Sequence, residues 1–204
     1  MSNRSPDATD RRWQERIVEE LPPIPLQPIE PGYPFRHFTG VGLWQGALAG
    51  CVSLVLNIIG SVLWPTIDGT AQHPLRLIEV YLTFPLGARA LDLEGGSLLA
   101  LGCIMYLATG MLYGMAFVLV LSYFLPNANL RDRLIACSLM AVVVWAVNFY
   151  GILSWLQPWL LGGAWITELI PWWVAAVTHL AFGWTIALVY PLAADSADEH
   201  NLEG

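Results

Sequence analysis

The chain has 204 residues, of which 56% are hydrophobic and only 12% are charged. Soluble domains carry about a quarter charged residues, so this composition excludes an ordinary soluble domain and indicates a small membrane protein. The net charge of −7 and the lack of any lysine leave no basic patch, so no nucleic-acid partner is expected.

Two polar tails flank an apolar middle. Residues 1–39 contain seven prolines and much of the charge, and such a segment cannot form a core of its own. We expect an extended tail there, or a strap lying on a partner subunit. The acidic residues 193–204 are predicted to be a solvated C-terminal tail.

Residues 40–192 contain four apolar runs, each long enough for the about 20 residues that cross a bilayer. We therefore predict an all-α membrane protein with four transmembrane helices, an even number that places both termini on one side. The predicted spans cover residues 41–64, 98–125, 134–155 and 172–192.

Arginines beside the spans bear on orientation. Three flank the spans on the terminal side and two on the far side: Arg36, Arg131 and Arg133 against Arg76 and Arg89. Because basic residues favour the cytoplasmic face, this distribution favours cytoplasmic termini in a cell inner membrane.

The two far-side connections are predicted to be interfacial. In residues 73–85, Arg76, Glu79 and Thr83 share one face of an amphipathic helix, which we expect to lie in the headgroup layer. Residues 157–171 carry Glu168 as their one charge and should dip into the same layer. We expect Glu79 and Glu168 to be solvated.

The chain contains an internal repeat. "NIIGSVLW" (57–64) matches "NFYGILSW" (148–155), and "TGMLYGMAFVLVL" (109–121) resembles "THLAFGWTIALVY" (178–190). A duplicated helical hairpin with pseudo-two-fold symmetry would explain both matches, although short matches can also arise by chance in so biased a composition.

Small residues recur on the predicted spans at helical spacing, which is typical of faces where membrane helices approach closely. The predicted packing glycines are Gly42, Gly46, Gly50, Gly60, Gly110, Gly114, Gly151 and Gly183.

Polar residues fall in one layer when each span is followed at 1.5 Å per residue. Each asparagine precedes a tryptophan at the far interface by seven residues, and the fourth span reaches a similar depth after Trp172. The layer comprises Asn57, Asn148, Thr109, Thr178 and His179. We predict that they face the bundle interior, either as ties between helices or as the lining of a binding site. Each asparagine should bond to the other half of the chain.

Catalytic and metal-binding motifs are not recognisable in the sequence, so an enzyme is not indicated and no cofactor is predicted. His179 is the one histidine within a predicted span. A haem or quinone shared with a partner subunit remains open.

Three glycine-containing patterns resemble those of small YagU-like bacterial membrane proteins: Gly46-x3-Gly50, Gly110-x3-Gly114 and His179-x3-Gly183. The resemblance covers residues 41–192 and implies a four-helix protein without an assigned activity. It implies no site.

Three functions remain open. The first is a non-enzymatic membrane subunit or scaffold, such as an accessory chain of a bacterial respiratory or other energy-converting complex. Its partners would be the lipid bilayer and other membrane subunits or a second copy. The second is a small-molecule binding or transport protein that uses the polar layer. The third is a haem- or quinone-linked redox subunit that uses His179.

Overall fold

The computed structural model describes residues 34–63, 76–93 and 96–192, which are helical apart from short connections and include no strand. The described part of the expected N-terminal tail is residues 34–39, which belong to the start of the first helix or adjoin it. The rest of that tail, Trp64 and the expected acidic tail from residue 193 lie outside the described residues.

Four helical stretches are long and apolar enough to cross a membrane. The third consists of three consecutive segments, because a π-helix, η2, separates the α-helices α5 and α6. The predicted all-helical chain with four potential spans is therefore confirmed. The stretches are α2 (Phe35–Leu63), α4 (Ser97–Phe124), α5 (Leu130–Ala146) with η2 (Val147–Leu153) and α6 (Ser154–Leu161), and α8 (Trp172–Val189).

Local hydrogen bonds explain why two spans begin earlier than hydropathy alone predicts. α2 starts at Phe35, where the backbone N–H of Phe38 donates to Pro34 O and the Thr39 hydroxyl donates to Phe35 O. α5 starts at Leu130 because the Asn129 side chain accepts a bond from the backbone N–H of Asp132. Such a cap satisfies one of the backbone donors that a helix start leaves open.

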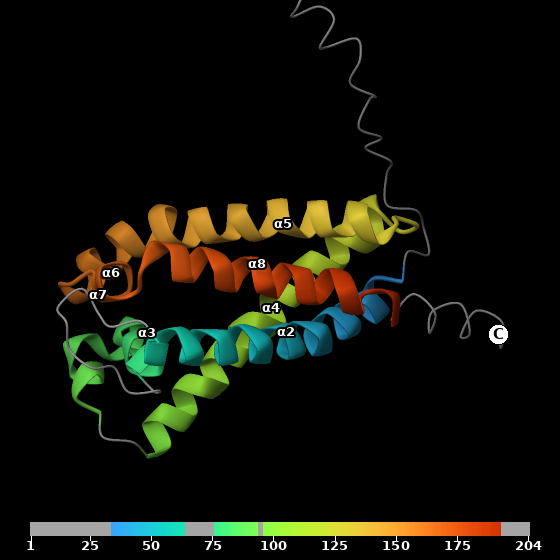
Figure 1. Ribbon diagram of the computed structural model, residues 1–204. Coiled ribbons are helices and arrows are strands. Elements are labelled where there is room, and N and C mark those ends of the chain that lie inside the picture. Colours follow the sequence, from blue (N-terminus) through green and yellow to red (C-terminus); the bar gives the residue numbers. More distant parts are fainter. Residues whose placement is uncertain (1–33, 64–75, 94–95, 193–204) are drawn as a thin grey trace, which may run out of the picture. The chain divides into compact units, whose positions relative to one another are not determined.

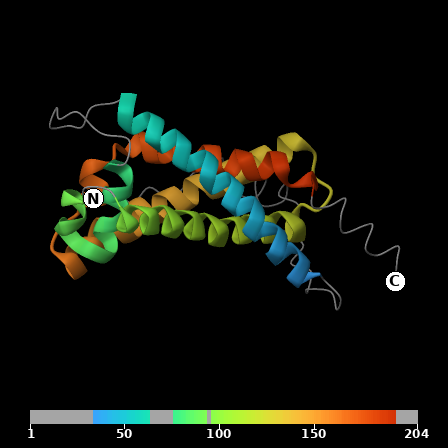
Figure 2. The ribbon, with the colours of Figure 1, turned by 90° about the horizontal axis from the view of Figure 1, so that it is seen from below.

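Glycines allow α2 and α4 to cross with their backbones in contact. A Cβ added to Gly46 would lie 2.9 Å from the Cα of Gly114, and one added to Gly42 would lie 2.9 Å from the backbone N of Met115. Gly110 faces Gly50 in the same contact. The two helices cross obliquely, as two perpendicular views show (Figures 1 and 2). This close approach is typical of small-residue stripes in membrane helices.

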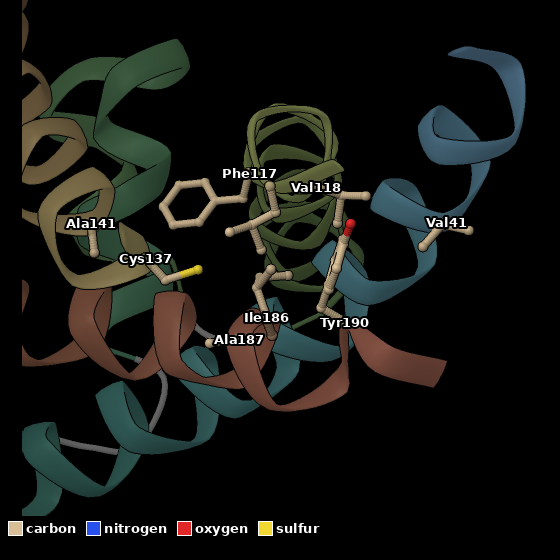
Figure 3. Packing of buried hydrophobic residues seen from close by; sticks show 10 residues of the cluster. Val41, Phe117, Val118, Cys137, Ala141, Ile186, Ala187 and Tyr190 are labelled. Atoms are coloured by element: carbon tan, nitrogen blue, oxygen red, sulfur yellow. The ribbon is translucent and has the colours of Figure 1, made fainter. Parts of the chain in front are cut away.

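The second helix pair, α5 and α8, packs around another glycine. A Cβ on Gly183 would lie 2.7 Å from the carbonyl oxygen of Cys137 and 3.2 Å from the Cβ of Ala141. Phe117 of α4 and Ile186 of α8 are buried in the same hydrophobic cluster, and the Phe117 ring extends from α4 toward the side of Cys137 and Ala141 (Figure 3). This cluster joins α4, α5 and α8, and α2 joins it through Val41 and Ala49.

Short helices gather at one end of the four spans. They are α3 (Arg76–Leu86), the 3-10 helix η1 (Gly87–Asp92) and α7 (Trp165–Leu169), which lie near α6. The start of α2 and the end of α8 lie at the opposite end (Figures 1 and 2). The four spans therefore run alternately up and down, with α3 and α7 in contact at the far end.

The prediction of a solvated polar face on α3 is wrong. Glu79 is 1% exposed and Thr83 is fully buried. Glu79 accepts a bond from Arg76 at 3.1 Å, and Thr83 accepts one from Gln157 of α6 at 2.9 Å. α3 also packs on α4, where a Cβ on Gly102 would lie 2.6 Å from Ile78 Cγ2. Burial on both faces overrides the amphipathic pattern.

Gly151 is also placed differently from its prediction as a packing glycine. It is exposed, and the nearest atom to a Cβ there would be a methyl group of Val147 at 3.8 Å in its own π-helix. Gly60, in contrast, faces Val174 of α8 at 3.5 Å. The repeated Asn-x-x-Gly pattern therefore places its two glycines in different surroundings.

Gly46→Ala should destabilise the protein more than Gly40→Ala, a matched change on the same helix. A methyl group on Gly46 collides with the α4 backbone, whereas one on Gly40 meets nothing within 4 Å. We expect Gly46→Ala to lower the free energy of unfolding by about 1–3 kcal/mol. Gly40→Ala should be neutral or slightly stabilising. Unfolding in mixed detergent micelles measures both, and equal effects would contradict the α2–α4 contact.

Candidate functional site

A cavity of about 410 Å³ lies among the helices. All four potential spans line it, and α3 and α7 add residues at the far end. Most of the lining is apolar, and a few polar side chains converge on it, which is the usual character of a small-molecule site. The polar lining residues are Ser53, Asn57, Tyr81, Tyr106, Thr109, Tyr113, Asn148, Thr178 and His179.

The five residues of the predicted polar layer all line this one cavity: Asn57, Asn148, Thr109, Thr178 and His179. They come from four different spans, as the depth argument required. The three tyrosines were not predicted. Tyr106 and Tyr113 of α4 lie three residues before and four after Thr109, so helical spacing around that threonine could have identified them.

A hydrogen-bonded group joins α2 to α4 and α8. Asn57 Nδ2 donates to the Tyr106 hydroxyl at 2.9 Å and to the carbonyl oxygen of Ser53 at 3.0 Å. The Ser53 hydroxyl lies 3.1 Å from the Tyr106 hydroxyl and donates to the carbonyl oxygen of Thr178 at 3.2 Å. Asn57 is thus tied to α4, which belongs to its own half of the chain.

Two more tyrosine bonds connect the remaining walls. The Tyr113 hydroxyl donates to Asn148 Oδ1 at 2.9 Å, which links α4 to the π-helix η2. This bond does cross between the two halves, as expected for Asn148. The Tyr81 hydroxyl lies 2.7 Å from Thr109 Oγ1 and links α3 to α4. Each predicted asparagine therefore has a tyrosine of α4 as partner.

The position of Asn148 depends on the irregular third span. It is the second residue of η2, a seven-residue π-helix from Val147 to Leu153. A π-helical turn is wider than an α-helical turn and frequently occurs at functional sites. The α4 and α5 helices make few contacts with each other, so the Tyr113–Asn148 bond spans a loosely packed side of the cavity.

His179 presents one ring nitrogen to the backbone. Its Nδ1 lies 2.7 Å from the carbonyl oxygen of Ala175, one turn earlier on α8. A carbonyl can only accept, so Nδ1 carries a hydrogen in this contact and Nε2 is the acceptor of the neutral ring. Thr178, beside it, donates to the carbonyl oxygens of Val174 and Ala175.

A buried hydrogen-bond chain fixes the far end of the cavity. Gln157 Nε2 donates to Thr83 Oγ1 at 2.9 Å, and Gln157 Oε1 accepts from the backbone N–H of Ile166 at 3.1 Å. α3, α6 and α7 are thereby joined beside Phe84 and Ile166, which line the cavity. Gln157 is fully buried and was missed, because nothing in the sequence indicated that this connection folds back on α3.

The predicted interfacial residues separate into two kinds. Arg76 and Glu79 form an ion pair within α3, and Arg76 also donates to the carbonyl oxygen of Leu91 at 3.1 Å. Glu168 of α7 is exposed, in keeping with a headgroup-level position. None of the three lines the cavity.

Metal-binding clusters of three or more His, Cys, Asp or Glu side chains do not occur within the described ranges. Comparison with known proteins finds no matching family model, no matching curated protein and no matching solved structure. The resemblance to YagU-like proteins therefore stays a prediction.

Asn57→Leu and Asn148→Leu should each lower the free energy of unfolding by about 1–2 kcal/mol, because the first removes a donor to the Tyr106 hydroxyl and the second leaves the Tyr113 hydroxyl hydrogen without its acceptor. The two asparagines belong to separate hydrogen-bonded groups, so their effects should add within about 0.5 kcal/mol. Asn57→Leu combined with Tyr106→Phe should be non-additive, since these residues bond directly. Double-mutant cycles in mixed micelles measure both, and strong coupling between the asparagines would contradict the separation.

Proposed function

We propose that this protein binds a small, uncharged and largely apolar molecule within the bilayer. The observation that carries the proposal is the cavity of about 410 Å³, on which the polar groups of four apolar helices converge. Its volume falls within the usual range for small-molecule sites, about 300–1,000 Å³. Binding, transport and sensing all begin with such an occupied site.

The lining favours an uncharged ligand. Among the described residues that line the cavity there is no Asp, Glu, Lys or Arg. An ion buried there would lose its hydration without gaining an opposite charge, which is costly. A neutral molecule would replace lost water bonds with bonds to the tyrosine, asparagine and histidine side chains.

The scaffold hypothesis loses one of its supports. The glycine stripes suggested a partner helix, but Gly46 and Gly114 face each other inside one chain. The Pro-rich tail, another of its supports beside the missing catalytic motifs, lies outside the described residues up to residue 33. A role as an accessory chain of an energy-converting complex, beside lipid and other subunits or a second copy, therefore stays a hypothesis.

The hypothesis of a haem- or quinone-linked redox subunit stays open. His179 is the single histidine among the lining residues that the structure describes. A haem bound through it would need its second axial ligand from a partner subunit. A quinone needs hydrogen-bonding groups in an apolar site instead, and so falls within the proposed ligand class.

Localisation and origin of the fold are further parts of the proposal. We place the chain in a bacterial inner membrane with cytoplasmic termini, on the arginine distribution. We also retain a duplicated hairpin, which the sequence repeat supports. The packing departs from two-fold symmetry, because α2 packs closely on α8 whereas the corresponding pair, α4 and α5, makes few contacts.

Reporter fusions should place the connection at residues 125–129 on the same side as both termini, and η1 on the other side. The up-and-down order of the four helices requires the sidedness, and the arginine bias predicts that the terminal side is cytoplasmic. Alkaline phosphatase and fluorescent-protein fusions measure it. Termini on opposite faces would contradict four spans, whereas both termini outside would contradict only the orientation.

Val144→Phe should abolish ligand binding, whereas Val143→Phe should not. Val144 lines the cavity, and its neighbour Val143 is 59% exposed on the outer face of α5. A phenyl ring at position 144 would occupy the space that a ligand needs. Mass spectrometry of organic extracts from purified protein should find a co-purifying molecule with the wild type and Val143→Phe, but not with Val144→Phe. Equal recovery from all three would contradict the proposal.

A further inference from the structure

The directions of the hydrogen bonds limit what the cavity can offer a ligand. Ser53 has one hydroxyl hydrogen, and the carbonyl oxygen of Thr178 can only accept it. The Tyr106 hydroxyl must therefore donate to Ser53 Oγ, and it accepts from Asn57 Nδ2 on its other side. The hydrogen of Tyr106 is thus used within the protein.

The other hydroxyl groups follow the same rule. Thr109 Oγ1 donates to the carbonyl oxygen of Met105, so the Tyr81 hydroxyl donates to Thr109. Tyr113 donates to Asn148 Oδ1, and Thr178 donates to backbone carbonyl oxygens. Each hydroxyl hydrogen around the cavity therefore has a protein acceptor, and these oxygens can offer a ligand only lone pairs.

Two side chains that line the cavity each have one polar atom that can bond to a ligand. His179 Nε2 is an acceptor, since Nδ1 holds the hydrogen that contacts Ala175 O. Asn148 Nδ2 is a donor, since the bond from Tyr113 is to Oδ1. Neither atom has a hydrogen-bond partner within the part of the chain that the structure describes. The site therefore combines one good acceptor with one good donor.

We propose that the ligand is an apolar molecule with a hydroxyl group, of the phenol or quinol type, which donates its hydrogen to His179 Nε2. Asn148 Nδ2, in the same lining, is a donor for an acceptor atom of the ligand. This inference rests on the proposed binding function and specifies its ligand class. Phe149 and Phe182 line the cavity, and aromatic side chains pack favourably with a ring. A ketone or ether lacks the hydrogen that His179 requires.

Three probes of nearly equal size test the hydroxyl requirement: 4-octylphenol, its methyl ether 4-octylanisole, and octylbenzene. Binding of tritiated 4-octylphenol is measured on full-length protein in nanodiscs, with the other probes as competitors. Nanodiscs that hold Val144→Phe serve as the blank for partition into lipid. The phenol should bind at least tenfold more tightly than the ether, since the ether leaves a buried acceptor unpaired.

Histidine variants locate the donor contact. His179→Phe should bind the phenol and the ether within about twofold of each other, because the ring acceptor is gone. His179→Gln can present an amide oxygen at a similar reach and should restore part of the preference. If His179→Phe does not fold, the comparison of phenol and ether on the wild type still decides the ligand class.

The outcomes separate the two proposals. If none of the three probes binds above the Val144→Phe blank, both the binding function and the ligand class are overturned. If all three bind equally to the wild type, the cavity is a binding site but the hydroxyl requirement is wrong. A phenol preference that persists unchanged in His179→Phe would overturn the assignment to His179.

Discussion

Contact between the backbones of α2 and α4 is the constraint on which the rest of the fold depends. Gly46 and Gly114 leave no room for even one methyl group between the two helices. The contact fixes both the oblique crossing and the register of α2 along α4. That register brings Asn57, three turns beyond Gly46, opposite Tyr106, which lies one turn before Gly110 on α4. The close packing of α2 on α4 thus determines the position of the Asn57–Tyr106 hydrogen bond beside the cavity.

The same geometry explains where space is left. α4 packs against α2 on one side, and α5 packs against α8 at Gly183. The two pairs meet around Phe117 and Ile186, where the core is filled. Toward the far end α4 and α5 make few contacts, and the Tyr113–Asn148 bond extends across the cavity between them. A polar bond there replaces apolar packing that a filled bundle would use.

Hydropathy and helical spacing were enough to predict the helices and the polar layer, because both follow from the bilayer and from 1.5 Å per residue. The partners were harder to predict. Tyr106 and Tyr113 look like ordinary aromatic residues of an apolar helix. The buried contact of Thr83 depends on Gln157 of α6 lying against α3, which is a long-range contact. The π-helix has no local sequence signal of its own.

The side chains around the cavity bear on whether it is a by-product of packing. Gly110 must be small because Gly50 lies against it. The space that its missing side chain leaves in the cavity therefore follows from the contact between α2 and α4. Val144 and Ile152 also line the cavity, and a larger side chain at either position would fill part of the space. Unfilled volume forfeits dispersion contacts with each lining atom. The hydroxyl hydrogens nevertheless all have protein acceptors, so the hydroxyl groups are satisfied without a ligand. Such a site is pre-formed, and a ligand would bind without first breaking these bonds.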